Sequence, residues 1–179
     1  MDAKHGPLIE GLSKLLVERG FMSAAEASSA AKAFRDRSET EFTHFLLDEG
    51  LIEEADLLEV LSAYYQVPPF DVNGYFFDRD MLKKFPKGVL LRHNMIPAEQ
   101  DENMLIVVAA DPADSNLLPI LGKYVSYDIR FNVGIARDIE DAVKEFYDES
   151  EERLETDMDR PEKYTEVKED VQIKRIIKE

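Results

Sequence analysis

The residue best placed to do chemistry in this sequence is an aspartate that follows a strand. Asp111 and Pro112 come directly after the apolar run 104–110, where a buried strand is expected to end. A carboxylate at the C-terminal edge of a strand can hold a ligand, so one hypothesis is a small enzyme that uses this edge. The sequence favours a structural role, in which Asp111 accepts hydrogen bonds from backbone amides of a turn.

The glycines near the start of the chain do not predict a phosphate-binding loop. Gly6 and Gly11 have the spacing of such a loop, but no lysine followed by serine or threonine comes after them. They also lie among the leucines of a helical stripe. The motifs G-x-G-x-x-G, H-E-x-x-H and G-x-S-x-G do not occur in the sequence. No nucleotide-hydrolysing or metal-dependent chemistry is predicted.

Histidine and cysteine chemistry is equally sparse. The sequence has no cysteine, which removes disulfides, thiolate nucleophiles and cysteine metal sites. The three histidines are scattered along the chain. His44 is interpreted as a partly exposed residue of a helix, and His93 as a cation at a helix end that the helix dipole favours. We therefore predict no catalytic residues, no metal ligands and no enzyme activity.

The composition restricts the class of partner. The formal net charge is -16 over 179 residues and the pI is about 4.6, so long-range repulsion opposes binding to nucleic acid or to an anionic membrane surface. The N-terminus lacks an apolar signal region, and no run approaches the roughly 18 apolar residues that span a bilayer. We expect a soluble, cytoplasmic protein that does not insert directly into a membrane.

An internal repeat defines the first elements. Residues 16–22 match residues 46–52 position for position, and each copy predicts a helix, a glycine stop and a second helix. The stops are Gly20 and Gly50, and the fourth helix is expected over residues 53–65. Two capping boxes are expected to open the second and third helices, formed by Ser23 with Glu26 and by Ser38 with Glu41. The first third of the chain is therefore predicted to be two helical hairpins.

The pattern changes after the second hairpin. Residues 67–72 contain two prolines and are expected to be extended. Strands are then predicted at 95–99, 104–110 and 127–133, with short helices between them and a last helix at 138–147. The predicted fold class is α+β. A helical subdomain spans residues 1–66, an α/β subdomain with a roughly three-stranded sheet spans 67–148, and 149–179 form a charged linker or disordered tail.

The order of the motifs resembles one family. Two helical hairpins are followed by Val-Pro-x-Phe-Asp, Met-Leu-x-x-x-Pro, Ile-Pro and a polar turn. Next come Leu-x-Val-Val-x-Ala-Asp-Pro, Ile-x-Phe and Ile-x-x-Ala-x-x-x-Phe-Tyr. Over residues 8–148 this series resembles the N-terminal domain of the type II secretion and type IV pilus assembly ATPases.

The resemblance implies docking and regulation rather than catalysis. In this family ATP hydrolysis belongs to a later domain with a P-loop, so we expect the chain to be a fragment or a free-standing relative. The expected partner is the cytoplasmic domain of an inner-membrane platform protein of a secretion or pilus system. An ATPase domain, in cis or in trans, is a further expected partner. The expected location is the cytoplasm, peripheral to the inner membrane through these partners.

One branch of the family binds cyclic di-GMP through both repeats, with Arg-Leu-Gly, two residues, Leu, three residues and Gly in each copy. Here the first copy reads Gly11-Leu12-Ser13 and the second reads Glu41-Phe42-Thr43. Both arginines and both motif glycines are absent, and Glu41 would set a carboxylate near a phosphate. Tyr64 replaces the glutamine that ends the pattern. We therefore predict no cofactor and no retained binding of cyclic di-GMP.

The alternative hypothesis is a cyclic di-GMP receptor domain that acts through the two repeats. In that case the ligand-contacting residues are those that match the family pattern or stand beside its arginines. They are Leu12, Leu16, Gly20, Phe42, Leu46 and Gly50.

Overall fold

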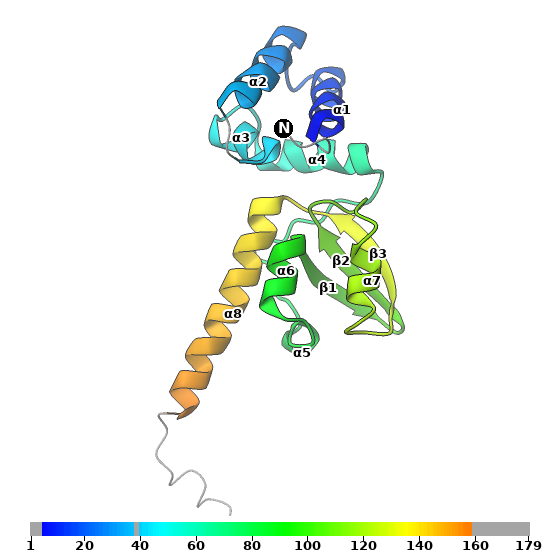
Figure 1. Cartoon of the computed structure of the whole chain (residues 1–179), viewed down its shortest axis with the longest axis vertical. Helices are drawn as coiled ribbons and strands as arrows, with labels where there is room; N and C mark the ends of the chain where they lie inside the picture. Colours follow the sequence, from blue (N-terminus) through cyan, green and yellow to red (C-terminus); the bar gives the residue numbers. More distant parts are fainter. Residues whose placement is uncertain (1–4, 38–39, 159–179) are drawn as a thin grey trace, which may run out of the picture. The chain divides into compact units, whose positions relative to one another are not determined.

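The computed structural model describes residues 5–37 and 40–158 and has the predicted α+β class (Figure 1). The described helices are α1 (His5–Glu18), α2 (Ala24–Arg37), α3 (Phe42–Asp48), α4 (Glu54–Tyr65), α5 (Arg79–Leu82), α6 (Lys87–His93), α7 (Leu117–Leu121) and α8 (Ala136–Met158). The described strands are β1 (Met95–Asp101), β2 (Met104–Ala109) and β3 (Asp128–Val133). The chain forms two compact units, one that ends at Val143 and one that begins at Lys144.

The two copies of the repeat fold into the same kind of helix end. Gly20 and Gly50 have positive φ angles of 78° and 66°, a left-handed conformation that glycine adopts without a steric penalty. In each copy the amide after the glycine donates to a leucine carbonyl at 2.9 Å, from Phe21 to Leu16 and from Leu51 to Leu46. This is the Schellman arrangement of a helix C-terminus. The Leu-x-x-x-Gly spacing of the repeat is therefore the spacing of a helix cap.

One of the two predicted capping boxes is formed. The amide of Glu26 donates to Ser23 Oγ at 3.1 Å, and the amide of Ser23 donates to Glu26 Oε1 at 3.0 Å. These hydrogen bonds lower the pKa of the Glu26 carboxyl. The second prediction needs correction, because Glu41 is itself the N-cap residue of α3 and its side chain makes no capping bond. Ser38 lies outside the described residues.

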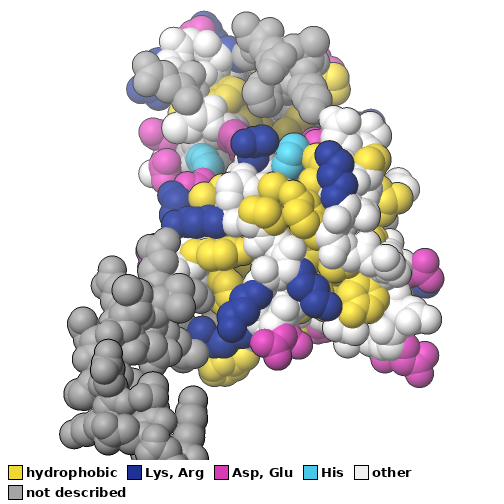
Figure 2. Space-filling model, turned by 60° about the horizontal axis from the view of Figure 1, so that its bottom comes forward, with side chains coloured by type: hydrophobic (Ala, Val, Ile, Leu, Met, Phe, Trp, Pro, Cys, Tyr) yellow, Lys and Arg dark blue, Asp and Glu magenta, His cyan; other side chains and the backbone are white. Residues whose placement is uncertain are grey.

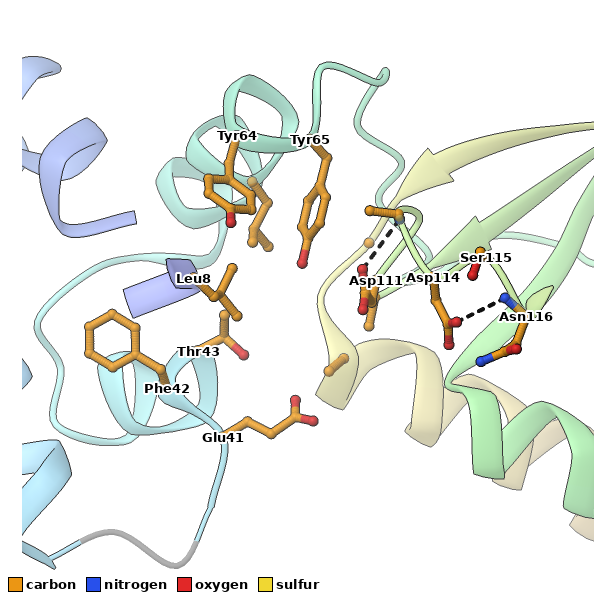
Figure 3. Close-up of a pocket in the computed structure, with 15 residues that line it drawn as sticks. Leu8, Glu41, Phe42, Thr43, Tyr64, Tyr65, Asp111, Asp114, Ser115 and Asn116 are labelled. Atoms are coloured by element: carbon orange, nitrogen blue, oxygen red, sulfur yellow. Dashed lines mark hydrogen bonds between the residues drawn. The ribbon is translucent and has the colours of Figure 1, made fainter. Parts of the chain in front are cut away.

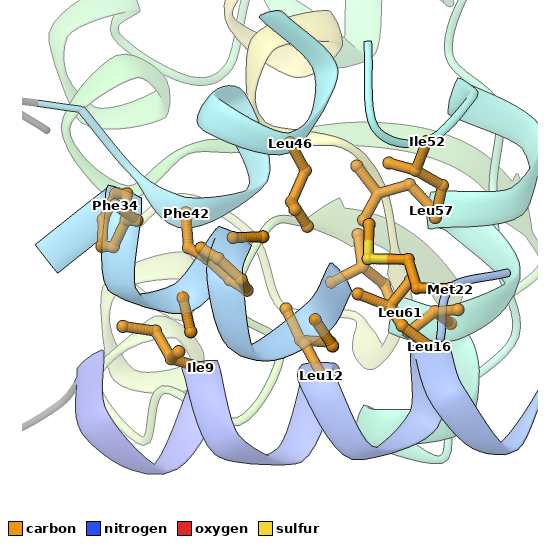
Figure 4. Packing of buried hydrophobic residues seen from close by; sticks show 14 of the residues in the cluster. Ile9, Leu12, Leu16, Met22, Phe34, Phe42, Leu46, Ile52, Leu57 and Leu61 are labelled. Atoms are coloured by element: carbon orange, nitrogen blue, oxygen red, sulfur yellow. The ribbon is translucent and has the colours of Figure 1, made fainter. Parts of the chain in front are cut away.

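The hairpins enclose one hydrophobic core (Figure 4). Leu12, Leu16 and Leu46 are at most 1% exposed. The rings of Phe34 and Phe42 meet edge to face with centroids 5.3 Å apart. The cluster also contains Val133 and Ile135, which belong to the end of β3 and the connection to α8. The helical repeats and the sheet thus bury apolar surface against each other.

The sheet is small and mixed. Its order is β1-β2-β3, with β1 antiparallel and β3 parallel to the central strand β2. The predicted extended segment 67–72 does not form a fourth strand. It pairs with the end of β3, where the Phe70 amide donates to the Val133 carbonyl and the Val133 amide donates to the Pro68 carbonyl, both at 2.9 Å. The helices α5 and α6 contact β1.

The last helix differs from the prediction. α8 continues to Met158, whereas the sequence pattern places its end near residue 147 and a linker or disordered tail after 148. Residues 149–158 are rich in glutamate, which has a high helix propensity, so the loss of apolar periodicity does not end the helix. The boundaries at residues 66 and 148 stay predictions. Among the described residues, no helix is both long and apolar enough to cross a membrane.

The shared core predicts a large effect of one truncation. Leu46→Ala should lower the free energy of unfolding by about 2–5 kcal/mol, because it opens a cavity among fully buried side chains. Leu51→Ala is the matched control, since Leu51 is 39% exposed and should cost well under half as much. Urea unfolding followed by circular dichroism measures both. Equal losses in the two variants would contradict the described core.

Candidate functional site

A pocket of about 620 Å³ lies between the helical hairpins, the loop after β2 and the start of α8 (Figure 3). The hairpin side contributes residues of α1, α3 and α4 together with the residue before α3, and the other side contributes the two connections that follow β2 and β3. The lining residues are Leu8, Glu41, Phe42, Thr43, Leu61, Tyr64, Tyr65, Ala110, Asp111, Ala113, Asp114, Ser115, Asn116, Gly134 and Ala136. Its volume lies within the range of small-molecule sites.

The lining of this pocket is acidic. Glu41, Asp111 and Asp114 contribute three carboxylates, and the described lining residues include no lysine or arginine. The field of these groups acts on the Tyr65 hydroxyl. Burial raises the pKa of Tyr65 most, and the nearby charges of Asp111 and Glu41 add to the rise. The Tyr65 hydroxyl therefore stays protonated and can donate a hydrogen bond.

The loop after β2 is held by its own aspartates. Asp111 Oδ1 accepts a hydrogen bond from the Ala113 amide at 3.2 Å. Asp114 Oδ1 accepts one from the Asn116 amide at 2.9 Å. The predicted turn at Asp111 is therefore confirmed. The same turn places both half-buried carboxylates along one side of the pocket.

Two consecutive tyrosines at the end of α4 form the opposite wall. The rings of Tyr64 and Tyr65 pack edge to face, with centroids 4.9 Å apart and an interplanar angle of 89°. Phe42 also lines the pocket, although only 2% of it is exposed. The aromatic faces can stack on a flat ring of a ligand, and the neighbouring carboxylates can accept hydrogen bonds from the edge of that ring.

Two departures from the family's ligand motif lie in direct contact. Gly11 stands where the first arginine is expected, and Tyr64 stands where the second copy has its final glutamine. The Tyr64 ring occupies the space that a side chain at position 11 would need, with Cδ2 2.8 Å from the place of a Cβ atom. Sequence reasoning noted each change separately. It missed their contact, because residues 53 positions apart carry no local signal of proximity.

The six predicted ligand-contacting residues fall into two groups. Leu12, Leu16, Phe42 and Leu46 come together in the core, each at most 2% exposed. Gly20 and Gly50 are exposed and occupy the two equivalent helix ends. Phe42 also lines the pocket. A ligand-binding role for the six residues stays a prediction, whereas four of them pack in the core and two end helices.

The contact between Gly11 and Tyr64 predicts a rescue. Gly11→Ala should lower the free energy of unfolding by about 1–3 kcal/mol, because the new methyl group displaces the Tyr64 ring. Adding Tyr64→Leu should remove part of that loss, giving a coupling energy on the order of 1 kcal/mol in a double-mutant cycle. Gly88→Ala is the control, since nothing lies within 4 Å of its Cβ position. Additive effects would show that the contact is absent.

Comparisons with known proteins show which domains this chain resembles. Residues 65–153 match the MshEN domain family. The type IV pilus assembly ATPase PilB of Myxococcus xanthus (strain DK1622) is 28% identical over 144 residues, a match that covers 80% of this chain and 25% of PilB. The chain thus spans about a quarter of the length of this curated relative.

Solved structures share the fold. A structure of MshE with cyclic di-GMP (cdg) has a TM-score of 0.60 and 23% identity, and covers 76% of this chain and 98% of that one. A structure of the N-terminal domain of XpsE has a TM-score of 0.53 and 18% identity, and covers 75% of this chain and 92% of that one. At these identities the two structures establish the fold.

The MshE structure overturns one prediction. We expected no cofactor and no retained cyclic di-GMP, but a structure of this fold contains that nucleotide. The expectation rested on the missing arginines and glycines, on the carboxylate of Glu41 and on Tyr64 in place of a glutamine, and it took no account of the pocket that Glu41 and Tyr64 help to line. The resemblance drawn from the order of motifs is confirmed. Over residues 65–153 the chain matches the MshEN domain, it is similar to a type IV pilus assembly ATPase, and it shares its fold with structures of MshE and of the N-terminal domain of XpsE.

Proposed function

We propose that this chain is a non-catalytic docking and regulatory domain of a type II secretion or type IV pilus machine. The observation that carries the proposal is the match of residues 65–153 to the MshEN domain. The proposed location is the cytoplasmic face of the inner membrane, reached through partner proteins. The proposed partner is the cytoplasmic domain of the membrane platform protein. The domain would regulate an ATPase domain, either in the same chain or in a separate one.

An exposed aromatic side chain marks a candidate docking surface. Phe76 is 96% exposed, and it stands between Tyr75 and Phe77, whose rings pack against each other with centroids 4.8 Å apart. Phe70 extends this packing to Tyr75 at 5.0 Å. The packed rings hold the backbone on both sides of Phe76. An aromatic residue presented in this way loses little conformational freedom on binding and is typical of an interface hot spot.

Basic residues follow Phe76 along the chain. In a chain of net charge -16, the segment 79–92 contains Arg79, Lys83, Lys84, Lys87 and Arg92. Figure 2 shows a face of the molecule on which Lys and Arg side chains border hydrophobic ones. Lys83 and Lys84 are exposed, and Lys84 Nζ lies 5.5 Å from the centroid of the Tyr127 ring. This local charge suits a partner surface that combines carboxylates with an apolar pocket.

The docking proposal predicts a loss of binding on one substitution. Phe76→Ser should weaken binding to the purified cytoplasmic domain of the platform protein at least about tenfold, because an exposed aromatic anchor is worth more than 1.4 kcal/mol at a hot spot. Leu118→Ser is the control, since Leu118 is 53% exposed on α7. A pull-down followed by titration calorimetry measures both variants. Absence of binding by the unaltered chain would refute the docking function.

The second candidate function is binding of cyclic di-GMP in the pocket. The MshE structure favours this function because it shares the fold and contains the nucleotide. The base fits the lining residues: Tyr64 and Tyr65 offer aromatic faces for stacking, and the carboxylates of Asp111 and Glu41 can accept hydrogen bonds from the N1–H and 2-amino groups of guanine.

The phosphodiesters fit this pocket less well. No lysine or arginine is among the lining residues, and the three carboxylates repel a negative ligand. The nucleotide would therefore be held through its bases, with its phosphates toward solvent. Binding of this kind has a distinct dependence on salt. Screening weakens the repulsion between carboxylates and phosphates, whereas it would weaken an attraction between arginines and phosphates.

Titration calorimetry with cyclic di-GMP tests the second candidate. We expect micromolar binding that is unchanged or tighter when the salt concentration rises from about 0.05 to about 0.5 M. Tyr65→Leu should weaken binding about tenfold or more, because base stacking on an aromatic ring is worth roughly 1–3 kcal/mol. Tyr127→Leu, outside the pocket lining, is the control variant. Cyclic di-AMP is the control ligand, since adenine lacks the N1–H and 2-amino donors. Binding that weakens steeply with salt would contradict this mode.

A further inference from the structure

Polar side chains from three segments meet beside the start of α8, in a second and smaller cavity of about 220 Å³. Asn73 Nδ2 donates a hydrogen bond to Glu54 Oε2 at 3.2 Å and another to Asp138 Oδ2 at 3.1 Å. Glu54 lies in the first turn of α4, and Asp138 lies in the first turn of α8. The amide of Asn73 therefore bridges a carboxyl group of the helical hairpins and one of α8.

The environment of Asp138 disfavours its negative charge. The residue is only 8% exposed, and this burial is the largest cause of a rise in its pKa to about 6. The negative charge of Glu54 and a hydrogen bond with its side chain raise the pKa further, whereas Asn73 and Arg137 lower it. When two carboxyl groups lie this close together, the state in which they share one proton is favoured over the state in which both are negatively charged.

Charged groups on the surrounding elements complete the cluster. Arg137 donates to Asp48 Oδ1, at the end of α3, at 2.7 Å, and its Nη2 lies 3.8 Å from Glu54 Oε1. Asp71, on the loop before α5, accepts a hydrogen bond from the backbone N–H of Asn73 at 3.0 Å and lines the same cavity. Arg137 is thus a cation near the carboxyl groups of Asp48, Glu54 and Asp138. It is partly exposed, so water and salt screen it.

We infer that Glu54 and Asp138 form a proton-controlled latch that fastens the helical hairpins to the start of α8. With one proton on the pair, a hydrogen bond joins the two carboxyl groups directly, in addition to the Asn73 bridge. Without it, the two carboxylates repel each other, and the polar part of the contact depends on Asn73 and Arg137. Gly134 and Ala136, on the same connection, line the larger pocket, so the latch controls one wall of that pocket. The inference does not depend on which ligand or partner the domain binds.

The direction of the pH dependence follows from the raised pKa. The folded state takes up the proton near pH 6, whereas an unfolded aspartate takes it up near its ordinary value of 3.8. Between these values the folded state binds more protons, so the latch stabilises the fold increasingly as the pH falls. That contribution is fully present below pH 3.8 and is lost as the pH rises through about 6.

NMR titration of the full chain tests the latch at its own atoms. The carboxyl carbon of Asp138 should titrate between pH 5 and 7 in the unaltered protein. Glu54→Gln should move that midpoint down by at least one pH unit, a tenfold change in proton affinity, because it removes the neighbouring charge. Asp141→Asn, an exposed position on α8, should leave the midpoint within a few tenths of a unit. A midpoint near 4 in the unaltered protein would overturn the inference.

Hydrogen exchange tests the mechanical consequence. Protection factors of amides in the first turns of α4 and α8 should rise several-fold from pH 7 to pH 5 in the unaltered protein. Asp138→Asn carries a neutral amide that imitates the protonated state, so its protection should be high at both pH values. The same pH-dependent rise in Asp138→Asn would show that other groups cause it and would refute the latch. If Asp138→Asn fails to fold, an unchanged rise in Glu54→Gln would refute it equally.

Discussion

The packing of the first unit depends on residues 133–138, which connect β3 to α8. Val133 and Ile135 enter the core of the helical hairpins. The residues between and after them, Gly134 and Ala136, face the larger pocket. Arg137 and Asp138 then reach the polar cluster on α3, α4 and the loop before α5. Six consecutive residues therefore serve the core, the pocket and the latch, so a shift in one of these regions acts on the other two.

A close backbone approach makes this arrangement possible. A Cβ atom at position 134 would lie 2.6 Å from Val108 Cγ1 on β2 and 3.1 Å from Ile139 Cδ1 on α8. The absence of a side chain lets the chain leave the sheet and enter α8 without a gap. At Gly134, little more than the backbone then separates the packed interior from the larger pocket. A short, closely packed segment of this kind transmits a displacement of its neighbours better than a flexible loop would.

The sequence predicted most of what is periodic or local, except the capping bond at Glu41, and missed what depends on distant contacts. The helices around Gly20 and Gly50, the box at Ser23 and Glu26 and the turn at Asp111 all rest on spacings of a few residues, and all are present. The approach of Tyr64 to Gly11 joins residues far apart in the chain, and so does the Asn73 bridge between Glu54 and Asp138. No spacing rule reports such pairs. The end of α8 was misplaced because apolar periodicity marks where a helix is buried, and α8 continues beyond the point where that pattern stops.

The family motif combines two roles, the capping of helix ends and the binding of a ligand. In this chain the repeat serves the first role and the pocket is suited to the second. Leu16 with Gly20 and Leu46 with Gly50 satisfy the ends of two helices, and this role requires no ligand. The pocket draws on positions outside these two helix caps, above all Tyr64, Tyr65 and Asp111. Substitutions at the motif's charged positions are therefore compatible with an intact scaffold, and they change the chemistry that the pocket offers. A lining of carboxylates and aromatic rings selects for hydrogen-bond donors and flat apolar surfaces, whereas a lining with arginines selects for phosphates. The same fold can thus present either kind of recognition without any change in its core.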